Sequence, residues 1–95
     1  MNYAYLTNEQ QAKMLEERLA TIEAEHYQRE INRLVAVELL QTATDSRLEE
    51  AKQLLAQEEA AQELLEAAFR AARSALDELS ARDGSPVKAD EGLPE

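Results

Sequence analysis

Residues 48–79 carry apolar or small side chains at alternating steps of three and four residues. This spacing is typical of the a and d positions of a helix that packs along its length on another helix. Two polar residues, Glu58 and Gln62, continue this spacing at the centre of the segment. We call these positions together the core row. Its apolar members are Leu48, Ala51, Leu55, Leu65, Phe69, Ala72, Leu76 and Leu79.

A second long helix is predicted over about residues 8–41, because no residue from Asn8 to Leu40 breaks a helix. Thr7 and Gln10 have the spacing of a capping box, in which two side chains satisfy free backbone amides at the first turn. The apolar face of this helix is interrupted by Glu30 and Arg33. Its other members are Leu15, Leu19, Ile22, His26, Val37 and Leu40.

The two helices are separated by residues 41–45, where Thr42, Thr44 and Asp45 are poor interior helix residues. Ser46 and Glu49 form a second capping-box pattern, so the next helix is predicted over about residues 46–83. Gly84 provides the expected C-terminal cap. A connection this short makes the helices antiparallel. We therefore predict an N-terminal arm (1–6), a helical hairpin (7–83) and a flexible tail (84–95).

Composition supports an all-α fold, because aromatic residues are only 4% of the chain and glycine and proline total four residues. The net charge is −10, so we expect no direct binding to nucleic acid or to an anionic membrane surface. With no cysteine, thiolate metal sites and disulfides are excluded. The sequence shows neither a membrane-spanning run nor a signal-peptide pattern. We expect a location in the cytoplasm or inside a virus particle.

The polar interruptions of the two helices are predicted to meet at one level. If the hairpin turns near Thr44, Glu30 lies opposite Glu58 and His26 lies opposite Gln62. Arg33 can then pair with Glu58 or with Glu30, while His26 pairs with Gln62 or with a carboxylate. We interpret these residues as a structural layer that sets register and holds no cofactor.

The alternative interpretation of this layer is a metal site. Glu23 and His26 form a Glu-x-x-His pair on one helical face. Two hairpins in a four-helix bundle would combine two such pairs with two copies of Glu58, which is the ligand set of a ferritin-like di-iron centre. Arg33 opposes this hypothesis, because it brings positive charge close to the proposed cations.

Both helices carry more apolar surface than one partner helix covers. The surplus residues predict a homo-oligomer, with a dimer forming a four-helix bundle, or a larger protein assembly. They are Ile31, Leu34 and Val35 in the first helix, and Leu54, Ala61, Leu64, Ala68 and Ala71 in the second.

With one histidine, no cysteine and no glycine-rich loop, the chain is not expected to be an enzyme. The sequence favours a self-associating scaffold, adaptor or assembly subunit, including a subunit of a phage particle. Two alternatives remain open: the metal-binding bundle, and an acidic inhibitor that imitates nucleic acid.

Overall fold

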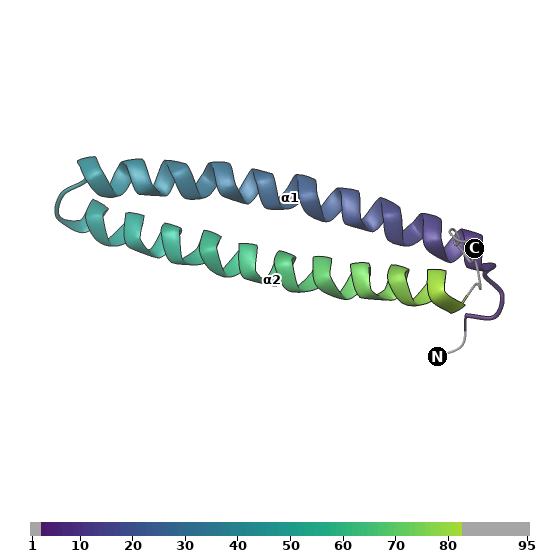
Figure 1. The fold of residues 1–95 in the computed structure, drawn as a ribbon. Helices are drawn as coiled ribbons and strands as arrows, with labels where there is room; N and C mark the ends of the chain where they lie inside the picture. Colours follow the sequence, from purple (N-terminus) through teal and green to yellow (C-terminus); the bar gives the residue numbers. More distant parts are fainter. Residues whose placement is uncertain (1–2, 83–95) are drawn as a thin grey trace, which may run out of the picture. The chain divides into compact units, whose positions relative to one another are not determined.

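The computed structural model describes residues 3–82 and contains two long helices, α1 (Asn8–Thr42) and α2 (Ser46–Arg82), which pack as a hairpin (Figure 1). The prediction of an all-α helical hairpin is confirmed. Both helices begin at the predicted residues. α1 ends at Thr42, and α2 extends to Arg82, the last described residue. The predicted tail and the cap at Gly84 lie outside the described residues.

The start of α1 is fixed by the predicted capping box. The Thr7 amide donates to Gln10 Oε1 at 2.8 Å, and the Gln10 amide donates to Thr7 Oγ1 at 3.0 Å. In addition, Gln11 Nε2 donates to the Leu6 carbonyl at 3.1 Å, which ties the arm to the first turn. The amides of Thr7 and Gln10, which the helix itself leaves without hydrogen-bond acceptors, are therefore both satisfied.

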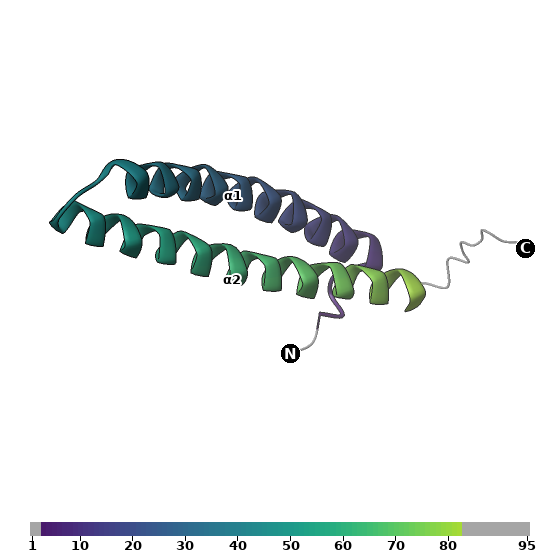
Figure 2. The ribbon, with the colours of Figure 1, turned by 60° about the vertical axis from the view of Figure 1, so that its left-hand side comes forward.

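A short connection joins α1 to α2 (Figure 2). It turns at Asp45, which has a positive φ of 58°. Aspartate tolerates this left-handed conformation better than most residues. The amides of Arg47 and Leu48 donate to the Thr44 and Asp45 carbonyls at 3.2 and 3.1 Å. These backbone hydrogen bonds begin α2. The expected reciprocal hydrogen bonds between Ser46 and Glu49 are not formed in the described part of the chain.

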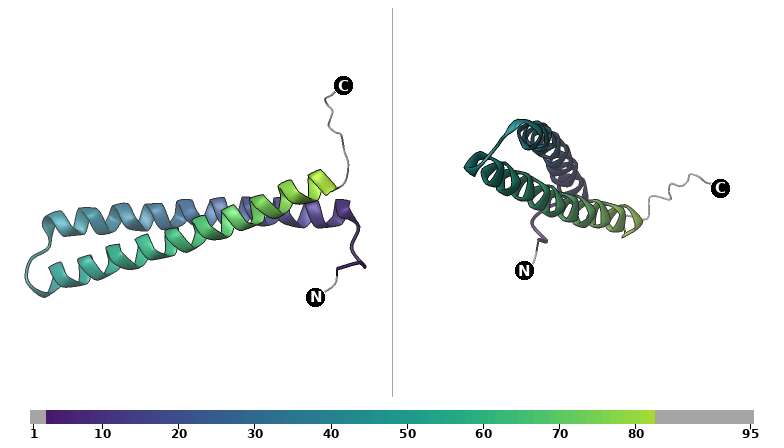
Figure 3. Two further views of the ribbon diagram at one scale, coloured as in Figure 1. Left: turned by 60° about the horizontal axis from the view of Figure 1, so that its bottom comes forward. Right: turned by 90° about the vertical axis from the view of Figure 1, so that its left-hand side faces the viewer.

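The chain divides into two compact units, each of which contains a segment of both helices. Unit 2 is Thr21–Phe69 and includes the connection; its α1 and α2 segments run in opposite directions (Figure 3). Unit 1 comprises Met1–Ala20 and Arg70–Glu95. Buried apolar residues in unit 1 are Leu19, Ala72 and Leu79, and those in unit 2 are Ile22, Ala36 and Ala51.

The core row of α2 is confirmed, because every one of its positions is buried or half-buried. The polar members Glu58 and Gln62 are among the buried residues. Ala36 is fully buried, yet no large side chain in residues 3–82 is fully buried. The facing surfaces of two helices thus form a narrow core in which even the leucines keep contact with solvent.

The two tyrosines of the N-terminal arm differ in exposure. Tyr3 is half exposed and lines a shallow groove of about 300 Å³ with Gln11 and Arg82. Tyr5 is 78% exposed. The Leu6 amide donates to the Tyr3 carbonyl and closes a turn. Tyr5 lies within this turn.

Neither α1 nor α2, over the residues described, has an apolar stretch long enough to cross a membrane.

Candidate functional site

Glu58 lies at the centre of the first polar contact in unit 2. Glu58 is only 5% exposed. Both of its carboxylate oxygens accept hydrogen bonds from Arg29 Nη1, at 3.2 and 3.3 Å. Asn32 Nδ2 donates to Glu58 Oε1 at 3.4 Å. A buried carboxylate is tolerated when charge and hydrogen bonds compensate for its lost hydration. Both donors come from α1, so this contact joins the two helices.

Glu30 is the centre of a second contact. Its two carboxylate oxygens accept from Arg33 Nε at 2.9 Å and Nη2 at 2.8 Å, in a bidentate ion pair. Gln62 Nε2 of α2 donates to Glu30 Oε1 at 3.0 Å. Hydrogen bonds lower the pKa of Glu30 from 4.5 to about 2. The hydrogen bond from Arg33 has the largest effect, and that from Gln62 has the next largest. The Glu30 carboxylate in turn raises the pKa of Arg33.

His26 forms the third contact, in which Nε2 lies 2.9 Å from Glu66 Oε2. The residues of the expected polar layer therefore occupy neighbouring turns of unit 2, but they belong to three separate contacts. Of the pairings left open by the sequence, Arg33 takes Glu30 and His26 takes a carboxylate. Each carboxylate of the three contacts lies within hydrogen-bonding distance of a polar partner, and the pairs Arg29–Glu58, Gln62–Glu30 and His26–Glu66 join α1 to α2.

Arg29, Asn32 and Glu66 also belong to these contacts, although the hydrophobic pattern did not single them out. Each lies beside the row of apolar positions and reaches the contact through a long or polar side chain. The register of the hairpin does indicate Arg29 as a partner of Glu58, because the two residues lie almost directly opposite each other when the turn is placed near Thr44. Arg29 lies outside the apolar face of α1, so the hydrophobic pattern alone does not indicate it.

The proposed metal ligands do not converge within one chain. Glu23 is exposed, His26 contacts Glu66, and Glu58 accepts from Arg29 and Asn32. Among residues 3–82, no group of three or more histidine, aspartate or glutamate side chains is arranged to hold a metal ion. In addition, a metal at Glu58 would have to displace a guanidinium group already bound to both of its oxygens.

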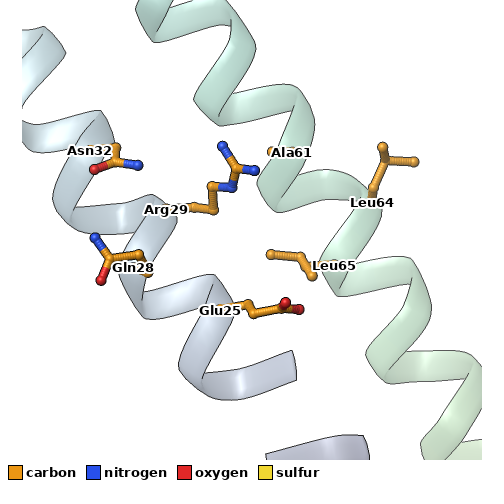
Figure 4. A pocket seen from close by; sticks show the side chains of 7 residues that line it. All are labelled: Glu25, Gln28, Arg29, Asn32, Ala61, Leu64 and Leu65. Carbon is orange, nitrogen blue, oxygen red and sulfur yellow. The ribbon is translucent and has the colours of Figure 1, made fainter. Parts of the chain in front are cut away.

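A groove of about 570 Å³ runs along one side of unit 2 (Figure 4). The α1 wall is polar and consists of Glu25, Gln28, Arg29 and Asn32. The α2 wall is apolar and consists of Ala61, Leu64 and Leu65. Leu65 points toward α1, whereas Leu64 points away from α1. A smaller groove of about 200 Å³, nearer the connection, is lined by Leu39, Arg47 and Leu54, among others.

The candidate interface residues differ in exposure. Leu64 is 74% exposed and Leu34 is 54% exposed, while Leu54 and Ala61 are half-buried. The remaining candidates, Ile31, Val35, Ala68 and Ala71, are exposed. Leu39, which the sequence did not single out for an interface, is also exposed. Unit 2 therefore presents large apolar side chains to solvent from both helices.

Comparisons of this chain with protein-family models, with curated proteins and with solved structures found no match.

Proposed function

We propose that this chain is a non-enzymatic helical interaction protein that associates with further copies of itself and acts as a scaffold, adaptor or assembly subunit. The observation that carries the proposal is the exposed apolar surface of unit 2. Five large aliphatic side chains there are exposed: Ile31, Leu34, Val35, Leu39 and Leu64. Four of them, Ile31, Leu34, Val35 and Leu39, share one face of α1. Exposed large apolar side chains that gather on one face mark surfaces that other proteins cover.

The incomplete core supports the same proposal. No large side chain among the described residues is fully buried, since two helices cover only one face of each other. Two further helices would bury more of this apolar surface, and each buried methylene group contributes about 0.8 kcal/mol. A four-helix bundle formed by two hairpins is the simplest assembly with this property.

The polar contacts of unit 2 fit a structural role in such an assembly. Glu58, Glu30 and His26 each have a partner on the same or the facing helix. These contacts favour one register of α1 against α2 and so give the apolar surface a constant shape.

Sedimentation equilibrium at micromolar concentrations tests the proposal. We expect a mass of at least twice the 10.7 kDa of the single chain, with dissociation on dilution. Leu64→Gln should shift the equilibrium toward monomer. Met14→Gln is the matched control, because Met14 is 56% exposed but lies in unit 1, outside the surface of unit 2. A monomer mass at every concentration would reject the proposal.

A further inference from the structure

We propose that the second copy docks through α2, with the two α2 helices antiparallel about a two-fold axis that crosses them between positions 62 and 63. This inference rests on the self-association proposed above and specifies its surface, direction and register. The contact surface is the apolar wall of the groove in Figure 4 and its continuation along α2.

Leu64 and the groove beside it form a projection and a recess on one surface. Leu64 is 74% exposed and points away from α1, while Ala61 and Leu65 line the recess (Figure 4). A two-fold interface uses the same patch on both copies, so a projecting side chain needs its recess on that patch. Unit 2 meets this requirement, since Leu64 of each copy can enter the groove of the other.

A second row on α2 repeats at steps of three and four residues beside the core row. We call it the outer row: Arg47, Glu50, Leu54, Gln57, Ala61, Leu64, Ala68, Ala71, Ala75, Glu78 and Arg82. From Leu54 to Ala75 it contains no charged residue, although 32% of the chain is charged. Two copies that each carry a net charge of −10 can therefore approach along this row without opposing carboxylates.

Side-chain size along the outer row favours the antiparallel direction. About the proposed axis, Leu64 faces the partner's Ala61 and Leu54 faces the partner's Ala71. Each large side chain then meets a small one, which allows the helices to approach closely along the whole contact. In a parallel pair each leucine would face its own copy and each alanine another alanine, with gaps between the leucine layers.

Charge at the ends of the outer row favours the same direction and register. Arg47 faces the partner's Glu78, and symmetry repeats this pair at the other end of the contact. Both side chains are exposed, and neither forms an ion pair within residues 3–82. A parallel pair would instead place Arg47 beside the partner's Arg47. The free charges of one copy are thus complementary to those of a second copy.

Cysteine cross-linking tests the register, because the natural chain contains no cysteine. Gln57→Cys and Ala68→Cys change two exposed positions that face each other across the proposed axis. The two variants are refolded together and oxidised, and covalent dimers are measured by non-reducing electrophoresis. We expect the mixture to form covalent dimers and each variant alone to remain uncrosslinked. In the antiparallel register, position 57 lies about 16 Å from its own copy, beyond the roughly 7 Å limit for a disulfide.

The matched control is a mixture of Lys52→Cys and Arg73→Cys. These exposed positions lie equally far from the axis in opposite directions but on the opposite side of α2, so we expect no cross-link. Cross-linking of Gln57→Cys with itself would overturn the proposed register, and cross-linking of both Gln57→Cys with itself and Ala68→Cys with itself would overturn the antiparallel direction. A dimeric wild type whose Gln57→Cys and Ala68→Cys mixture stays uncrosslinked would overturn the register. A monomeric wild type would instead reject the self-association itself.

Discussion

Glu58 is an acidic residue at a core-row position, and its neighbours explain how the hairpin accommodates it. The carboxylate is buried, while the side chain of its partner Arg29 is 46% exposed. The two residues therefore differ in what their removal leaves behind. Loss of Arg29 leaves a buried carboxylate with only the Asn32 amide, whereas loss of Glu58 leaves a guanidinium that can return to water.

This asymmetry predicts opposite effects of two substitutions on the free energy of unfolding. Arg29→Ala should lower it by about 1–3 kcal/mol, because a buried acceptor loses its main partner. Glu58→Leu should leave it unchanged or raise it, since an apolar residue then completes the core row. Denaturant unfolding at one fixed protein concentration measures both. Glu63→Leu, at an exposed position, is the control, with an expected change within about 0.5 kcal/mol. Equal losses for Arg29→Ala and Glu58→Leu would contradict this account.

Glu30 gives the folded state a dependence on acid pH. Its pKa falls from 4.5 to about 2, chiefly because Arg33 donates to the carboxylate, so the ionised form is favoured in the folded chain. The stabilisation is therefore present above pH 4.5 and is lost as the pH falls toward 2. Thermal melts across this range should show that Glu30→Gln loses less stability on acidification than wild type. Identical pH profiles for the two proteins would show that the Glu30 contact does not contribute.

The helices themselves were largely predictable, because each depends on local signals and on one repeating pattern. Thr7 and Gln10 marked the start of α1 correctly, and the core row identified the packed face of α2. The start of α2 was predicted at the right residue for an incorrect reason. Its first turn is held by backbone carbonyls next to the left-handed Asp45, and sequence spacing alone does not reveal that conformation.

Partner choice within the polar contacts was less predictable. The register brings Glu30, Arg33, Glu58 and Gln62 to neighbouring levels, but several pairings are then within reach of long side chains. Arg33 pairs with Glu30 one turn away on its own helix, which leaves Arg29 to reach Glu58. Which arginine takes which carboxylate depends on side-chain conformations, and the hydrophobic pattern does not encode them.

At the scale of α2, the proposed dimer makes a prediction about paired charges. Arg47→Glu should weaken self-association roughly tenfold, since two exposed ion pairs become repulsive contacts. Glu78→Arg should weaken it similarly, although it makes the chain less acidic whereas Arg47→Glu makes it more acidic. The double variant restores opposite charges at both ends and should recover most of the affinity. Sedimentation of the four proteins checks this, and a double variant no stronger than either single one would exclude the pairing.

The chain as a whole has twice as many acids as bases, and this charge opposes the association proposed for its apolar surface. Two copies of net charge −10 repel each other over distances set by ionic strength. Contact along the uncharged part of the outer row is gained only after that repulsion has been overcome. Salt should therefore act on the assembly mainly through the net charge.

We accordingly predict that self-association strengthens as sodium chloride is raised from low to physiological concentration. The screening length falls from about 30 Å at 0.01 M to about 8 Å at 0.15 M, which reduces repulsion between the copies and leaves the apolar contact intact. Dissociation constants from sedimentation should fall several-fold. A variant with Glu49→Lys and Glu63→Lys should respond less, because it carries less net charge. An acidic inhibitor bound to a basic partner would behave in the opposite way and release that partner as salt increases. Weaker self-association at the higher salt concentration would therefore contradict an interface that is mainly apolar.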